Sequence, residues 1–187
     1  MLYLGPNQQD DSARSANNTN WQLYYQQQAA TASHPLLQQF YGAGMVAAET
    51  PISQVPLVAI DFETTGLSAE LLPRLAGKVA VVHYRQIERD FLSASVKVRL
   101  GENILFPVID TLELEARLHR VKPLSWWDKL RKRQQVSIRL DASRSRYNLP
   151  PYRPHHAVTD AIASAELLQA QICHRFSPDT PVSELWC

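Results

Sequence analysis

Three short apolar runs in the middle of the chain predict three buried strands. They span residues 56–62, 78–84 and 104–110. Each run is almost continuously apolar instead of alternating with polar residues, which is typical of a parallel sheet with both faces covered. The third run contains Pro107, which has no N–H to donate to a neighbouring strand. We therefore expect the third strand at an edge of the sheet.

Helical patterns of apolar residues follow the strands. They predict helices near residues 69–76, 85–96 and 111–120, and two further helices at 136–146 and 156–174. In the last helix, a stripe at helical spacing predicts the face that packs on the core: Ala157, Ala161, Ala165, Leu168 and Ile172. Strands and helices that alternate along the chain are the sequence signature of an α/β fold.

The first 50 residues have a different character and are rich in Gln, Asn, Ala and Ser. We expect a disordered start followed by one or two short amphipathic helices between Asn20 and Tyr41. The aromatic residues of these helices are expected to pack on the folded domain. We interpret residues 1–50 as an N-terminal extension and residues 51–187 as the domain itself.

The composition is that of a globular protein, because 45% of the residues are hydrophobic and only 20% are charged. No stretch approaches the ~20 apolar residues of a membrane span, and no secretory signal is visible. Two cysteines form neither a disulfide framework nor a zinc site. We therefore expect a soluble cytoplasmic protein with reduced thiols and no membrane partner.

Positive charge is concentrated in one window of the sequence. Residues 117–146 hold ten Lys or Arg residues against two acids, although the whole chain has a net charge of only +1. Such asymmetry points to a polyanionic partner, or else to a solvated basic face without a ligand.

Polar residues end the three apolar runs, where α/β proteins form their sites. These residues are Asp61, His83 and Asp110. Asp61 and Glu63 are two residues apart in an extended segment, so both carboxylates face the same side. Paired carboxylates suit Mg²⁺ or Mn²⁺, although capping of the next turn is an alternative role. We expect His83 to be structural, and Asp110 with Thr111 to cap the helix that follows.

Four segments in order resemble the motifs of the DEDD 3′–5′ exonucleases. The first is Asp61-Phe-Glu-Thr-Thr-Gly-Leu67, and the last is His155-His-Ala-Val-Thr-Asp-Ala161, which is similar to the last motif of the histidine-using subtype. Residues 81–92 and 108–114 resemble the segments between them. The similarity covers roughly residues 57–175 and is strongest to proofreading exonucleases of the DNA polymerase III epsilon type.

This resemblance implies a ribonuclease H-like α/β fold with a reduced, mainly parallel sheet flanked by helices. It implies hydrolysis of DNA phosphodiesters from the 3′ end, with two Mg²⁺ or Mn²⁺ ions as cofactors. The implied partners are single-stranded 3′ ends of DNA and, as a candidate, a DNA polymerase subunit. The implied metal-binding carboxylates are Asp61, Glu63, Glu88 and Asp160, and the implied general base is His155.

Two further groups of residues are candidates for contact with the substrate. Thr64, Thr65 and Leu67 follow the first acidic pair, where the resemblance implies contact with the terminal nucleotide. A basic run inside the positive window is suited to the phosphate backbone, and comprises Lys129, Arg131, Lys132 and Arg133. The neighbouring Trp126 and Trp127 either stack on bases or pack in the core.

Several of these residues also have other interpretations. His156 is an alternative to His155 as the base, although the spacing to Asp160 favours His155. Glu88 is either a metal ligand or a surface residue paired with Arg85 at ordinary helical spacing.

The chain departs from the family in one respect. Only 27 positions separate Asp61 from Glu88, whereas the family has a stretch several times longer with additional strands. This shortening is expected to leave the first strand at an edge. It favours, as an alternative function, a catalytically impaired remnant that binds nucleic acid or a partner protein. An RNA-directed exonuclease is a third hypothesis.

Replacing Lys129, Arg131, Lys132 and Arg133 together by Glu is expected to weaken binding of single-stranded DNA, because counterion release drives such binding. The measurement is fluorescence anisotropy of a labelled strand at several salt concentrations. Unchanged affinity would refute the role of this basic run.

Overall fold

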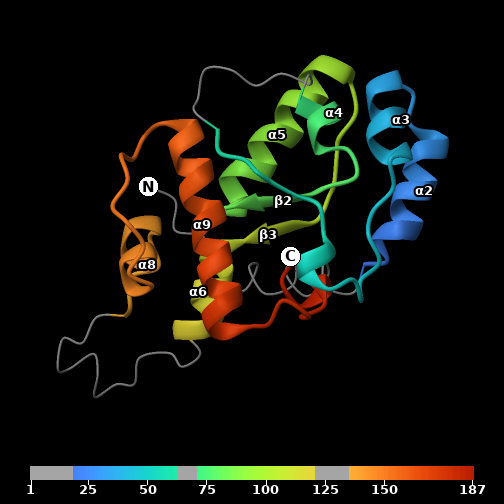
Figure 1. Ribbon diagram of the computed structural model, residues 1–187. Coiled ribbons are helices and arrows are strands. Elements are labelled where there is room, and N and C mark those ends of the chain that lie inside the picture. Colours follow the sequence, from blue (N-terminus) through green and yellow to red (C-terminus); the bar gives the residue numbers. More distant parts are fainter. Residues whose placement is uncertain (1–18, 63–70, 121–134) are drawn as a thin grey trace, which may run out of the picture.

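The computed structural model describes residues 19–62, 71–120 and 135–187 (Figure 1). The helices are α2 (Trp21–Thr31), α3 (Pro35–Gly42), α4 (Leu72–Leu75), α5 (Arg85–Leu100), α6 (Thr111–His119), α8 (Leu140–Arg146) and α9 (Ala157–Arg175). The strands are β1 (Leu57–Ala59), β2 (Val79–Val82) and β3 (Val108–Asp110), and short 3₁₀ turns span Ile52–Gln54 and Val182–Glu184. The predicted α/β order of elements is confirmed.

The three strands form a parallel sheet in the order β1-β2-β3. β2 lies in the centre, and all four of its residues are buried. β1 is an edge of the described sheet, as the shortened connection predicts, and β3 is the other. Helix α9 crosses one face of the sheet, and α5 lies behind the opposite face (Figure 1). Because helices cover both faces of the sheet, the strands are continuously apolar.

The strands are shorter than the apolar runs that predict them. β3 begins directly after Pro107, because a residue without an N–H cannot join the ladder. β1 ends at Ala59, although the Ile60 N–H still donates to the Val81 carbonyl at 3.0 Å. The sheet therefore occupies only the centre of each predicted run.

A buried carboxylate, that of Asp110, joins the sheet to two helices. Its Oδ1 accepts hydrogen bonds from the Leu112 and Glu113 N–H groups at 2.9 and 3.4 Å, which caps α6 as predicted. It also accepts from the Tyr84 N–H at 3.0 Å, while Oδ2 accepts from the Arg85 N–H at 2.9 Å. Asp110 thus holds the first turns of α5 and α6 together.

These hydrogen bonds hold the chain in an unusual conformation between β2 and α5. Tyr84 has a φ of 92°, in the left-handed region that residues with a side chain rarely adopt. The Asp110 carboxylate binds the N–H of Tyr84 itself, so it compensates for the strain of the turn. The turn directs α5 back along the sheet.

Helices α2 and α3 share the hydrophobic core of the sheet. Their buried aromatic residues Trp21, Tyr25, Phe40 and Tyr41 belong to the same cluster as the residues of β2. The predicted helices between Asn20 and Tyr41, and the packing of their aromatic residues on the domain, are confirmed. The predicted disordered start lies outside the described residues.

The buried face of α9 differs from the predicted stripe. Only Leu168 of that stripe is fully buried, whereas Ala163, Ser164, Leu167, Ala170 and Gln171 are buried with it. The buried face of α9 is therefore turned relative to the predicted stripe, because it also faces polar groups of α6 and α8. No helix in the described ranges has both the length and the apolar character needed to cross a membrane.

The segment after α9 returns to the sheet. Trp186 forms an antiparallel bridge with Ile109 of β3, and the Cys187 N–H donates to the Val108 carbonyl at 2.8 Å. Just before it, the Val182 N–H donates to the Thr50 carbonyl at 2.9 Å. Residues near 50 and near 182 are thus tied together.

Substitution Asp110→Ala is expected to lower the free energy of unfolding by about 3–5 kcal/mol, because it removes the cap of α6 and leaves the N–H groups of Tyr84 and Arg85 unpaired. Chemical denaturation measures the change. The control Asp90→Ala removes an exposed carboxylate of α5 and is expected to stay within about 0.5 kcal/mol of the parent. Equal stability of both variants would contradict the role of Asp110.

Candidate functional site

A cleft of about 550 Å³ lies beside β1 and is bordered by helices α4 and α9. Asp61 lines it, immediately beyond the end of β1. The lining also includes Val58, Ala59, Ile60, Phe62, Leu71, Arg74, Leu75, Ala157, Val158 and Ala161. An apolar cleft of this volume with a carboxylate at its rim has the character of a ligand site.

Glu88 is a buried residue and not a surface residue. Only 6% of Glu88 is exposed, and its Oε2 accepts the Phe62 N–H at 3.0 Å. The interpretation of Glu88 as a surface partner of Arg85 is therefore wrong, because the helix turns this carboxylate toward β1. Glu88 fixes the start of α5 to the residue that follows Asp61.

Asp160 lies in the first turns of α9 and binds the backbone that precedes the helix. Its Oδ2 accepts the N–H groups of His155 and His156 at 2.9 and 3.2 Å. Its Oδ1 is buried and has no hydrogen-bond partner. One oxygen of this carboxylate thus binds the backbone before the helix, while the other is buried without a partner.

His155 lies in the loop before α9, where the spacing to Asp160 predicts it. Its φ is 65°, in the left-handed region, and the hydrogen bond from its N–H to Asp160 holds it there. Backbone strain of this kind collects at functional sites. His156, the alternative base, is the residue directly before the helix, and both histidines are exposed.

Arg144 and Tyr152, which no sequence motif indicates, order the segment that leads into α9. The buried Arg144 donates to the carbonyls of Ala163 and Pro150 at 2.8 and 2.9 Å and pairs with Glu166 Oε2 at 2.7 Å. Its guanidinium lies over the Tyr152 ring, 5.0 Å from the ring centroid. Arg144 thereby holds the loop between α8 and α9 against the latter helix.

Burial raises the pKa of Tyr152, and the negative charges of Asp160, Asp141 and Asp61 raise it further against the opposing effect of Arg144. The charges of Asp61 and Asp160, which are far apart in the sequence, thus act on the same phenol. The only signal of this loop in the sequence is the run of prolines at 150, 151 and 154, which indicates a stiff connection.

The predicted carboxylate site is only partly visible in the structure. Asp61, Glu88, His155 and Asp160 are described, and nowhere in residues 19–62, 71–120 and 135–187 do three acidic, histidine or cysteine side chains form a group able to hold a metal ion. The remaining predicted residues lie outside those ranges: Glu63, Thr64, Thr65, Leu67, Lys129, Arg131, Lys132 and Arg133.

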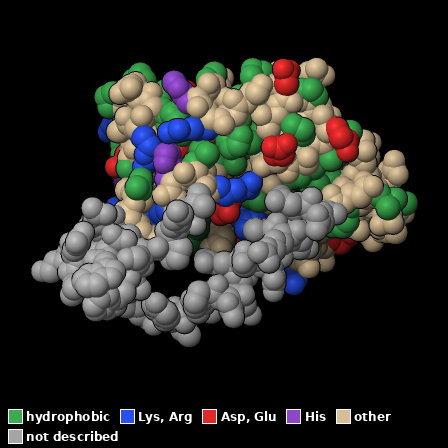
Figure 2. All heavy atoms as spheres, turned by 90° about the horizontal axis from the view of Figure 1, so that it is seen from below, with side chains coloured by type: hydrophobic (Ala, Val, Ile, Leu, Met, Phe, Trp, Pro, Cys, Tyr) green, Lys and Arg blue, Asp and Glu red, His purple; other side chains and the backbone are tan. Residues whose placement is uncertain are grey.

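Four of the five arginines that are described in the positive window donate to backbone carbonyls, namely Arg117, Arg120, Arg144 and Arg146. Arg120 donates twice to the Val136 carbonyl at 2.9 and 3.0 Å, and Arg146 binds both Ser137 and Glu115. In Figure 2, blue Lys and Arg side chains and purple His side chains lie close together on the face seen from below. These arginines stabilise the connections around α8.

His83 has the structural role that its position predicts. Thr111 Oγ1 donates to the Val82 carbonyl at 3.1 Å, so the histidine Nδ1 donates its hydrogen to Thr111 Oγ1 at 2.8 Å. Its Nε2 is buried without a partner. Burial lowers the pKa of His83, although Asp110 and Glu115 oppose the effect.

Comparison of the chain with models of known protein families, with curated protein sequences and with solved structures gave no match.

The free energy of unfolding is expected to fall as the pH drops below about 6.5. The unfolded chain takes up a proton near that ordinary histidine pKa, whereas folded His83 takes it up only at lower pH. The His83→Gln variant should therefore lose less free energy of unfolding than the parent between pH 7 and pH 5, as measured by chemical denaturation at each pH. A loss equal to that of the parent would assign the pH dependence to other groups.

Proposed function

We propose that this protein is a metal-dependent 3′–5′ exonuclease acting on single-stranded ends of DNA, with a reduced ribonuclease H-like fold. The observation that carries the proposal is the buried, unpartnered Oδ1 of Asp160, on the helix that borders the cleft lined by Asp61. The order of the sequence motifs supports the same function.

A divalent cation fits the chemistry of these donors. A buried carboxylate oxygen without a partner is costly unless a cation or a donor compensates it. Asp160 and Asp61, together with the neighbouring Glu63, would hold such a cation, and Glu88 would support them through Phe62. When bound, divalent cations stabilise charge on the attacking and leaving oxygens of a phosphodiester.

The side chains around the cleft supply the remaining functions. The apolar lining contributed by β1, α4 and α9 would accept the terminal nucleoside. His155 would accept the proton of the attacking water, and its backbone is held by the carboxylate of Asp160. The Tyr152 hydroxyl is protonated at neutral pH, and its raised pKa extends this to higher pH, so it would donate to a phosphate oxygen.

A second function, binding of nucleic acid or a partner without catalysis, is favoured by two observations. The described residues hold no group of three metal-ligating side chains, and Oδ2 of Asp160 serves as a helix cap. The preference for DNA over RNA, a polymerase subunit as partner and a cytoplasmic location stay predictions.

The deciding experiment incubates the protein with 5′-labelled single-stranded DNA and Mn²⁺. We expect a ladder that shortens from the 3′ end and is abolished by EDTA. Asp160→Asn should lose at least about 100-fold in rate, because the amide can still accept the capping N–H groups but lacks the negative charge. Asp179→Asn, at an exposed site beyond α9, is the matched control.

A folded protein that binds the strand but leaves it intact would favour the binding module. Equal rates for Asp160→Asn and Asp179→Asn would remove Asp160 from the mechanism, and with it the observation on which the exonuclease proposal rests.

A further inference from the structure

Two arginines at the start of α5 play no part in the candidate site above. Arg85 and Arg89 are four residues apart, so their side chains leave the same face of the helix. Glu88 of the same turn faces β1 through its bond to Phe62. The Arg85 N–H donates to Asp110, at the end of β3, and the charge of Asp110 also acts on the Arg89 guanidinium.

Arg85 is buried to an unusual degree for a charged residue. Only 6% of it is exposed, and its Nη1 is shut off from solvent without a hydrogen-bond partner. No ion pair joins either arginine to an acid in the described residues. Burying a guanidinium in this way is costly unless an anion compensates its charge.

The neighbouring acidic groups provide only part of that compensation. The Asp110 carboxylate already accepts four backbone N–H groups. Burial raises the pKa of the Cys187 thiol to about 11, so the thiol is uncharged at neutral pH. Asp90 is exposed on another side of the helix.

The balance of charge at Arg89 agrees with this description. Burial lowers the pKa of Arg89, and repulsion from Arg85 lowers it further. Cys187, Asp90 and Asp110 act in the opposite direction without cancelling the effect. The site therefore has an excess of positive charge in a partly buried place.

We propose that Arg85 and Arg89 form a binding site for a phosphate group, in which the buried, unpartnered guanidinium of Arg85 and the neighbouring guanidinium of Arg89 bind its oxygens. Planar guanidinium groups match pairs of phosphate oxygens, and two of them balance a dianion. The site uses other residues than the proposed nuclease centre and does not depend on it.

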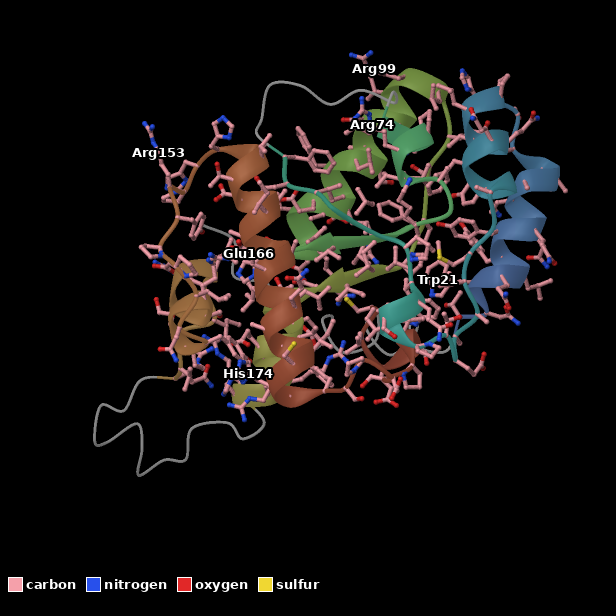
Figure 3. The ribbon with its side chains drawn as sticks, viewed as in Figure 1. Trp21, Arg74, Arg99, Arg153, Glu166 and His174 are labelled. Atoms are coloured by element: carbon pink, nitrogen blue, oxygen red, sulfur yellow. The ribbon has the colours of Figure 1, made fainter. Side chains whose placement is uncertain are left out.

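Isothermal titration with inorganic phosphate, in EDTA and against chloride of equal ionic strength, tests the site. We expect phosphate to bind to the parent protein, and binding to weaken roughly tenfold or more in Arg89→Gln and in Arg85→Gln. Arg99→Gln is the matched control, because this arginine lies in the last turn of the same helix and points into solvent (Figure 3). Absence of binding, or equal weakening in all three variants, would overturn the proposal.

Two additional arms identify the source of the phosphate and guard against misfolding. The ligand is a nucleic-acid end if a 5′-phosphorylated oligonucleotide binds more tightly than inorganic phosphate and its unphosphorylated form does not bind more tightly. Equal or tighter binding of inorganic phosphate indicates a free phosphate ion.

Arg85→Met should match or exceed the Tm of the parent in phosphate-free buffer and lose the rise in Tm that phosphate gives the parent. A phosphate response retained in Arg85→Met would overturn the proposal.

Discussion

The fold depends on the hydrogen bonds that the Asp110 carboxylate accepts. Parallel strands need long connections, and each connection must enter its helix at the carboxyl edge of the sheet. At this edge, one buried side chain caps α6 and also binds the turn that begins α5. The directions of both helices are thus set by the end of one strand. The placement of Glu88 against the segment after β1 follows from the direction of α5.

Local patterns in the sequence predict most of the elements. The five helical stretches after residue 68, the three strands and the edge position of β1 follow from periodicity and from the short connection before β2. The cap formed by Asp110 is a local signal as well, whereas the predicted capping role of Thr111 was wrong, because its hydroxyl binds the Val82 carbonyl. That the same carboxylate binds Tyr84 and Arg85 is not predictable, because those residues are 25 positions or more away in the chain and meet it only in the sheet.

The candidate site shows where such patterns fail. The spacing of Arg85 and Glu88 is compatible with a surface pair, yet the structure buries both residues and separates their partners. Arg144 and Tyr152 carry no motif, because their role arises from the packing of a proline-rich loop on α9. The predicted stripe of α9 was only partly right for a related reason. Polar side chains of α6 and α8, those of Glu115 and Arg144, form part of its buried surroundings, and hydrophobic periodicity does not register them.

The return of the last described segment to the sheet has a consequence for the order of folding. Trp186 lies against Ile109, and Val182 is bonded to Thr50, so the contacts that complete the domain span most of its length. Contacts of such sequence separation form late and slowly, since the intervening chain must first be ordered. During synthesis, β3 therefore keeps an open side until the residues after α9 have left the ribosome. A chain interrupted before that point would retain all of its motif residues with an incomplete sheet.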